Sequence, residues 1–139
     1  MLPTTRFKYT FLALVVVQAT HSIEEYFGRL YEVFLPARFV SGLISDNLER
    51  GFIIFNVALV GFGLWCFVWP VRREWPSAMG FAWIWVAIEM VNSIGHPLWS
   101  PIALGYTPSV ATAPVLLVLA LYLAYELGNS SLDPLPARK

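Results

Sequence analysis

The chain has 139 residues, of which 58% are hydrophobic and 13% are charged, and its formal net charge is zero. Because a soluble domain carries roughly a quarter charged residues, this composition excludes an ordinary water-soluble domain and indicates an integral membrane protein. The basic residues are scattered along the chain, so a nucleic acid is not an expected partner. The single cysteine, Cys66, excludes an intrachain disulfide bond and a cysteine cluster for zinc.

Four apolar segments are each long enough to cross the hydrocarbon core of a bilayer as a helix. They cover about residues 7–27, 51–71, 77–98 and 110–127. From them we predict an all-α fold, an integral membrane four-helix bundle. It forms one four-span transmembrane domain over residues 1–128, with a cytoplasmic tail at 129–139. Pro114 lies inside the fourth segment and is expected to kink its helix.

The connection between the first two segments, from Pro36 to Arg50, also carries a pattern. Its apolar residues recur at helical spacing and are Phe39, Val40, Leu43, Ile44 and Leu48. This spacing predicts a short amphipathic helix that lies on the membrane surface, and a well-packed loop is the alternative. The first helix itself could continue as far as Leu35, where Pro36 interrupts it.

Lysine and arginine are distributed unequally between the two sides of this bundle. The side that holds both termini carries Arg6, Lys8, Arg72, Arg73, Arg138 and Lys139, and the other side carries Arg29, Arg38 and Arg50. Short cytoplasmic loops are enriched in lysine and arginine. We therefore expect both termini in the cytoplasm and the protein in the plasma (inner) membrane.

The N-terminus also fits a second interpretation. Arg6 and Lys8, the apolar run that follows them and the small residues near Ala19 resemble a cleaved secretory signal peptide. The apolar helical pattern continues past this point to Phe34, however. We therefore expect the segment to be retained as the first span.

Two of the segments carry a polar stripe. At about 100° per residue, His21, Glu24 and Glu25 share a face of the first helix. On the third helix the residues that share a face are Glu89, Asn92, Ser93 and His96. Ionisable residues inside a membrane are costly and usually mark a functional site.

The heights of these polar residues agree. At a rise of about 1.5 Å per residue, both stripes fall in the outer half of the membrane. Asn56 on the second segment and Thr112 near the start of the fourth reach a comparable level. The sequence therefore predicts a polar chamber inside the bundle that opens toward the outer side.

Together these residues resemble a known family. HSIEEY at 21–26, Asn56, NSIGH at 92–96 and YTPSVAT at 106–112 are similar to the HXXEE family of small integral membrane proteins, whose reaction is not established. The resemblance covers about residues 18–123 and suggests an enzyme. It implies that the family's signature polar positions are His21, Glu24, Glu25, Asn92 and His96. One departure is Ser109, which stands where the family's turn often has glycine.

These groups predict acid–base chemistry without a cofactor on a lipid or isoprenoid-like substrate. A protonated carboxyl group beside an ionised one can donate a proton while a neighbour removes another. The expected acid is Glu24 or Glu25 and the expected base is Glu89, with Asn92 and the two histidines as orienting groups. The reaction would be isomerisation, cyclisation or the opening of an epoxide or ester. The expected substrate-binding residues are Asn56, Trp85, Trp99, Tyr106 and Thr112.

Two other functions fit the same residues. The first is a metal-dependent membrane hydrolase or oxidase with zinc, iron or manganese. Its expected ligands are His21, Glu24, Glu25, Glu89 and His96. The second is a non-enzymatic proton or metal-ion carrier, or a small membrane subunit. We see no polar residue that continues a path to the inner side, which favours an enzyme over a carrier.

Overall fold

The computed structural model describes residues 4–99 and 108–130. This part of the chain forms six α-helices and contains no strand, so the predicted all-α fold is confirmed. The helices are α1 (Thr5–Phe27), α2 (Leu30–Val33), α3 (Leu35–Ile44), α4 (Leu48–Cys66), α5 (Ala78–Trp99) and α6 (Ala113–Ser130). A π-helical turn, η1 (Phe67–Val71), continues α4. Most of the predicted tail, from residue 131 onward, lies outside the described residues.

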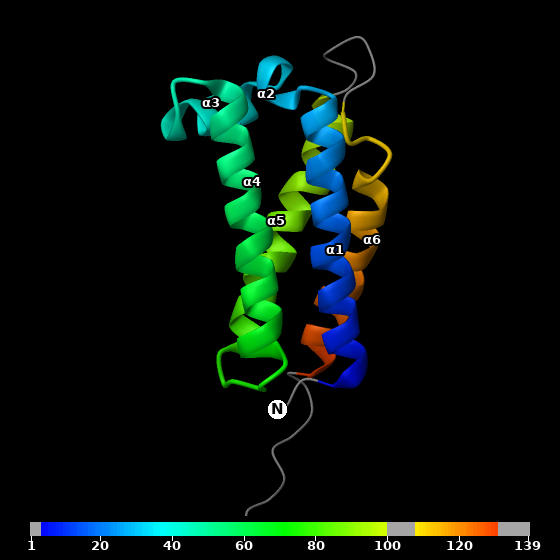
Figure 1. The fold of residues 1–139 in the computed structure, drawn as a ribbon. Helices are drawn as coiled ribbons and strands as arrows, with labels where there is room; N and C mark the ends of the chain where they lie inside the picture. Colours follow the sequence, from blue (N-terminus) through cyan, green and yellow to red (C-terminus); the bar gives the residue numbers. More distant parts are fainter. Residues whose placement is uncertain (1–3, 100–107, 131–139) are drawn as a thin grey trace, which may run out of the picture.

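The four long helices alternate in direction (Figure 1). α1 and α5 run from the lower to the upper end of the bundle, and α4 and α6 run back. α1 packs against α4 and α6, and α5 packs against α6. The start of α1 and the end of α6 therefore lie at the same end, and α2 and α3 cover the opposite end, which we call the capped end.

The buried faces of α1 and α5 change character along their length. Buried positions on each helix follow one another at intervals of three or four residues, the spacing of a single helix face. On α1 they include Phe7, Phe11, Leu14, Gln18, His21 and Glu25. On α5 they include Ala78, Ala82, Trp85, Glu89, Ser93 and His96. The bundle thus has an apolar core toward the start of α1 and the end of α6, and a polar interior toward the capped end.

α1 ends at Phe27, so the expected continuation of the first helix to Leu35 is wrong. Arg29 adopts a left-handed backbone conformation with φ 53°, which breaks the helix. At Gly28 an added Cβ would lie only 2.3 Å from a side-chain carbon of Pro108. Glycine is therefore required where the turn before α6 packs onto the end of α1.

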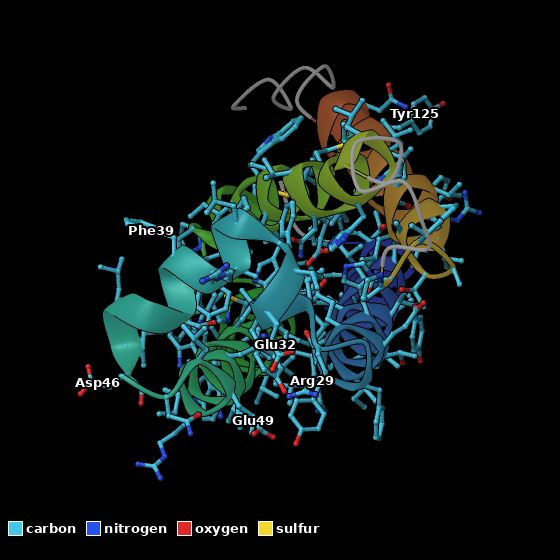
Figure 2. The ribbon with its side chains drawn as sticks, turned by 90° about the horizontal axis from the view of Figure 1, so that it is seen from above. Arg29, Glu32, Phe39, Asp46, Glu49 and Tyr125 are labelled. Carbon is cyan, nitrogen blue, oxygen red and sulfur yellow. The ribbon has the colours of Figure 1, made fainter. Side chains whose placement is uncertain are left out.

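The short helix predicted after the first segment is confirmed as α3, and the alternative of a loop is wrong. Pro36 lies in its first turn, where the missing N–H group costs nothing. Ser41 is buried against the bundle, whereas Phe39 and Leu43 are exposed. Seen from above, Phe39 points outward from the capped end (Figure 2).

The expected kink at Pro114 is wrong. α6 begins at Ala113, so Pro114 is its second residue. A proline in the first turn of a helix interrupts no internal hydrogen bond and its ring meets no preceding turn. The fourth long helix is therefore shorter at its start than the apolar run in the sequence.

Within residues 4–99 and 108–130, two helical segments are long and apolar enough to cross a membrane, Leu48–Val71 and Ala78–Leu98. They correspond by length and composition to the second and third predicted spans. The apolar stretch of α6, Ala113–Asn129, is shorter. Polar residues interrupt the apolar character of α1 over its second half.

The contact between α3 and α4 gives a test of this packing. A Cβ at Gly51 would lie 2.1 Å from the backbone oxygen of Ser41, whereas a Cβ at Gly61 would meet no atom within 4 Å. Gly51→Ala should therefore lower the free energy of unfolding by about 1–3 kcal/mol through overpacking. Gly61→Ala, on the same helix, should raise it by about 0.5–1 kcal/mol. Thermal unfolding of the purified chain in detergent measures both, and equal melting temperatures for Gly51→Ala and the wild type would contradict the packing.

Candidate functional site

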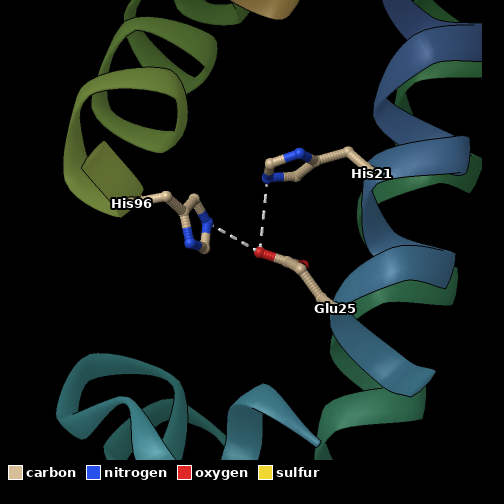
Figure 3. A group of neighbouring side chains, drawn as sticks. All are labelled: His21, Glu25 and His96. Atoms are coloured by element: carbon tan, nitrogen blue, oxygen red, sulfur yellow. Dashed lines mark ion pairs between the residues drawn. The ribbon is translucent and has the colours of Figure 1, made fainter. Parts of the chain in front are cut away.

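Three buried side chains from two helices meet near the capped end (Figure 3). His21 and Glu25 lie one turn apart on α1, and His96 lies near the end of α5. Glu25 Oε1 is 3.0 Å from His96 Nε2 and 3.4 Å from His21 Nε2. The two imidazole rings meet edge to face, with their centroids 4.9 Å apart. One carboxylate oxygen is thus shared between two histidines.

The hydroxyl group of Thr112 orients the imidazole ring of His21 through its Nδ1 atom. Thr112 Oγ1 donates to Glu24 Oε2 over 2.7 Å, and His21 Nδ1 lies 2.7 Å from the same hydroxyl oxygen. A hydroxyl group carries one hydrogen. Because Glu24 accepts that hydrogen, the Thr112 oxygen accepts from His21, and we infer that Nδ1 of His21 carries a proton.

The turn before α6 also fixes the backbone at His21. Ser109 Oγ donates to the backbone oxygen of His21 over 3.2 Å. Ser109 has φ 74°, the left-handed region that favours glycine. The hydrogen bond to α1 offsets part of the strain that serine accepts in this conformation.

Two ring nitrogens of the site lack a hydrogen-bond partner among the described residues. They are His21 Nε2, which faces Glu25, and His96 Nδ1, and both are buried. A buried polar atom without a partner costs about 1–3 kcal/mol. Such a cost is typical of a site where a proton, an ion or a substrate takes part.

A second polar chain links α1 to α4 and α5 beside this group. Asn92 donates to Gln18 over 3.2 Å, Gln18 donates to Ser22 over 3.1 Å, and Ser22 donates to Asn56 over 2.7 Å. Asn56 in turn donates to the backbone oxygen of Phe52. Amide and hydroxyl groups from three helices are thus held in one chain of neutral hydrogen bonds.

A cavity of about 180 Å³ lies between α1, α4 and α5 under the capped end. Its polar lining comes from Gln18, Glu25, Ser41, Asn56, Asn92 and His96. Its apolar lining comes mainly from Leu30, Phe34, Val40, Phe52, Phe55 and Leu59. His21 is fully buried behind Glu25 and is not among the lining residues.

The structure brings most of the predicted site residues together. His21, Glu25 and His96 form the shared group, and Asn56 and Asn92 line the cavity beside it. Glu24 reaches the site through Thr112, because position 24 points toward the turn before α6. Polar residues from α1, α4 and α5 and from the residue directly before α6, Thr112, therefore lie at about one height in the bundle. The predicted heights implied this arrangement.

Two other predicted site residues, Glu89 and Trp85, lie outside both the three-residue group and the cavity lining. Glu89 is fully buried on α5, but it belongs neither to the three-residue group nor to the cavity lining, and its carboxyl oxygens have no hydrogen-bond partner among the described residues. Trp85 packs in the apolar core against Phe11, one turn farther from the capped end. The side chain of Trp99 and all of Tyr106 lie outside the described part of the chain.

Sequence reasoning missed three contributors. Ser22 connects Gln18 to Asn56, and Ser109 holds the backbone of His21. Phe34 stacks near His96, with ring centroids 5.6 Å apart, and lines the cavity. Ser22 lies inside the motif at residues 21–26, but its role depends on where α4 packs, and the motif does not encode that.

The three-residue group could hold a metal ion. One ligand atom from each of His21, Glu25 and His96 lies within 4.8 Å of the others, and all three side chains are buried. Two imidazole nitrogens and a carboxylate oxygen suit zinc, iron or manganese. The Nδ1–H group of His21, held by Thr112 and Glu24, is the kind of outer contact that fixes a metal-binding histidine.

Comparison with protein-family models, curated proteins and solved structures gives no match for this chain. The part of the chain that the structure describes defines a class by its fold and site: it is all-α, has two helices of membrane-spanning length and buries a group of two histidines and a glutamate. Its function is inferred from these residues.

The hydroxyl of Thr112 gives a test of the site. Thr112→Val keeps the shape of the side chain but leaves His21 Nδ1 without its acceptor, so the Nδ1-protonated form of His21 should lose its preference. Unfolding should become easier by about 1–3 kcal/mol. Nitrogen-15 NMR of the imidazole rings and thermal unfolding measure the two effects.

The matched control is Thr20→Val, because Thr20 is exposed on α1 and its hydroxyl bonds only to the backbone oxygen of Val16 among the described residues. This change should leave both measurements near the wild-type values. An unchanged His21 spectrum in Thr112→Val would show that the hydroxyl does not set the protonation of that ring.

Proposed function

We propose that this protein is a small integral membrane enzyme that isomerises an apolar, lipid or isoprenoid-like substrate by acid–base chemistry. The observation that carries the proposal is Glu25 Oε1, held between the imidazoles of His21 and His96 at the wall of a cavity. The motif that supplies these residues is also the basis for proposing that the chain belongs to the HXXEE family.

Support for a membrane location comes from the outer surface of the bundle. No charged residue occurs between Arg50 and Arg72. Large exposed apolar side chains cover the long helices instead and include Val16, Ile54, Val57, Trp83, Val91 and Val118. Apolar surface of this extent favours contact with lipid. Among the described residues, the end of the bundle where α1 begins carries Arg6, Lys8, Arg72 and Arg73, against Arg29, Arg38 and Arg50 at the capped end. This excess supports a cytoplasmic location for the end where α1 begins.

Support for an apolar substrate comes from the cavity lining. Aromatic and aliphatic side chains from α2, α3, α4 and the segment between α2 and α3 form most of its wall. Its two ionisable residues, Glu25 and His96, come from α1 and α5. A pocket with a few convergent polar groups in an apolar wall orients a substrate by its polar or reactive end. The reactive carbons would therefore lie against Glu25 and His96.

The reaction we propose moves a double bond. Glu25 and His96 lie 3.0 Å apart. In the proposed scheme this pair holds one proton, and the partner that carries it donates it to a carbon of the double bond. The cation that forms loses a proton from a neighbouring carbon to the partner that lacks one, and the electron pair of that C–H bond forms the new double bond. The rings of Phe34 and Phe52 face the cavity and would stabilise the positive charge.

His21 acts as a positioning residue in this scheme. Its Nδ1 is held by Thr112 and its Nε2 faces the oxygen of Glu25 that His96 also contacts. It therefore keeps the carboxyl group turned toward His96 and the cavity. Glu89, predicted as the base, is replaced in that role by the Glu25 and His96 pair, because these two line the cavity.

Solvent deuterium gives a direct test. Membranes that contain the protein are incubated in D2O, and their lipids are compared by mass spectrometry with membranes that lack it. The wild type should produce a lipid with deuterium bound to carbon, because the donated proton comes from a group that exchanges with water. Glu25→Gln should reduce the rate of this labelling about 10²–10⁴-fold.

Glu32→Gln is the matched control, since it makes the same chemical change at an exposed carboxylate that pairs with Arg29. It should leave the labelling unchanged. Labelling that persists in Glu25→Gln, or the absence of any label that depends on the wild-type protein, would contradict the proposed reaction.

A metal-dependent membrane hydrolase or oxidase is the second candidate function. The observation that favours it is the pair of buried ring nitrogens without hydrogen-bond partners among the described residues, one of them on His21 facing Glu25. An ion bound to His21, Glu25 and His96 would use such a nitrogen and polarise a substrate oxygen or activate a water molecule.

Elemental analysis separates the two candidates. If the metal-dependent function is correct, the chain purified in mild detergent should retain near-stoichiometric zinc, iron or manganese. His96→Ala should lose it, and Glu89→Gln should retain it because Glu89 lies apart from the group. Wild-type protein that holds no divalent ion even after incubation with each of the three metals would contradict this candidate.

A further inference from the structure

A long apolar groove runs along the outside of the bundle between α1 and α4. Its volume is about 470 Å³, and α4 contributes most of its lining, from Phe52 to Leu64. At about 1.5 Å per residue, this stretch is roughly 18 Å long. One lipid leaflet spans half of a hydrocarbon core that is about 30 Å thick. The groove is therefore slightly longer than one leaflet is deep.

The groove and the cavity share a wall. Phe52 and Asn56 line both of them. The hydrogen bond from Ser22 to Asn56 lies at this boundary, and Ser22 itself lines the groove. Near this boundary the groove is polar at Ser22, Tyr26 and Asn56, whereas the rest of its lining is apolar or glycine.

The cavity is too small to hold a whole lipid, so a lipid substrate would also need an apolar binding surface beside the cavity. A cavity of about 150 Å³ holds a molecule such as benzene, so a cavity of about 180 Å³ accommodates only the reactive end of a lipid. The remaining chain must lie outside it. The groove begins at the cavity wall, is apolar and has the length of a chain in one leaflet.

We propose that the groove between α1 and α4 binds one acyl chain of the substrate, with Asn56 at the boundary with the cavity. This inference rests on the proposed function for the identity of the bound molecule as substrate. The chain would lie along Val57 and Leu64, and its functionalised end would pass Ser22 and Asn56 to reach Glu25.

Photolabelling tests the groove. The full chain is placed in lipid nanodiscs with a trace of palmitic acid that carries a diazirine in its chain, and labelled residues are located by mass spectrometry. Labelling at Val57 and Leu64 should be strong and should decrease when excess unlabelled palmitic acid is added. Val118 and Leu121 on α6, which are equally apolar and exposed, should show weaker labelling that the competitor does not decrease.

Phenylalanine substitutions at two glycines test whether the groove itself binds the labelled chain. Gly61 lines the groove, and a Cβ there meets no atom within 4 Å, so Gly61→Phe should fold and fill the groove with its ring. The competable labelling should be lost. Gly80 on α5 has the same free space but does not line the groove, and Gly80→Phe should leave the labelling intact.

The outcomes separate this inference from the proposed reaction. Glu25→Gln should keep the competable labelling, so a groove that binds the chain without any deuterium transfer would uphold the groove and reject the reaction. Labelling at Val57 and Leu64 that matches α6 and does not saturate would overturn the groove. Competable labelling by a diazirine-bearing prenyl alcohol but not by palmitic acid would overturn the assignment to an acyl chain.

Discussion

A single carboxylate oxygen shared by two buried imidazoles is the contact on which the interior of this protein depends. Glu25 Oε1 joins α1 to α5 through His96, and His21 faces the same oxygen from its own helix. A buried charged group is costly unless it is paired, so removing either partner leaves an uncompensated group in the interior. Two imidazoles and a carboxylate that meet at one point are groups used in acid–base chemistry and in the binding of a cation.

The rest of the bundle holds this contact in place. The apolar half packs α1, α5 and α6 through residues such as Phe11, Trp85 and Leu116. This packing sets the rotation of α1 and α5, so the continuing faces bring Glu25 and His96 together. The turn at 108–112 then closes on α1 through Gly28, Ser109 and Thr112, and it fixes both the backbone and the ring of His21. Aromatic residues and the short helix at the capped end complete the cavity beside the site.

Periodicity in the sequence was enough to predict the long helices and the convergence of their polar faces, because one helix face follows directly from residue spacing. It placed His21 and Glu25 on one face of the first helix, and His96 at the same height on a face of the third long helix. It could not predict the end of α1 at Phe27, which the left-handed backbone of Arg29 follows, or the close approach of Pro108 to Gly28. Nor could it assign Glu24 to Thr112, separate Glu89 from the site, or reveal Ser22 and the groove. Each of these depends on how helices distant in sequence are rotated and packed.

Solid-state NMR in lipid bilayers tests the central contact most directly, because the chain has only two histidines. Protein labelled with carbon-13 at glutamate carboxyl groups and nitrogen-15 in the imidazole rings reports carboxyl–imidazole distances, and Glu25→Gln assigns the signal. We predict that one carboxyl group, that of Glu25, is coupled to both imidazole rings, as Oε1 distances of 3.0 and 3.4 Å require. Coupling to one ring only, or to neither, would contradict the shared site.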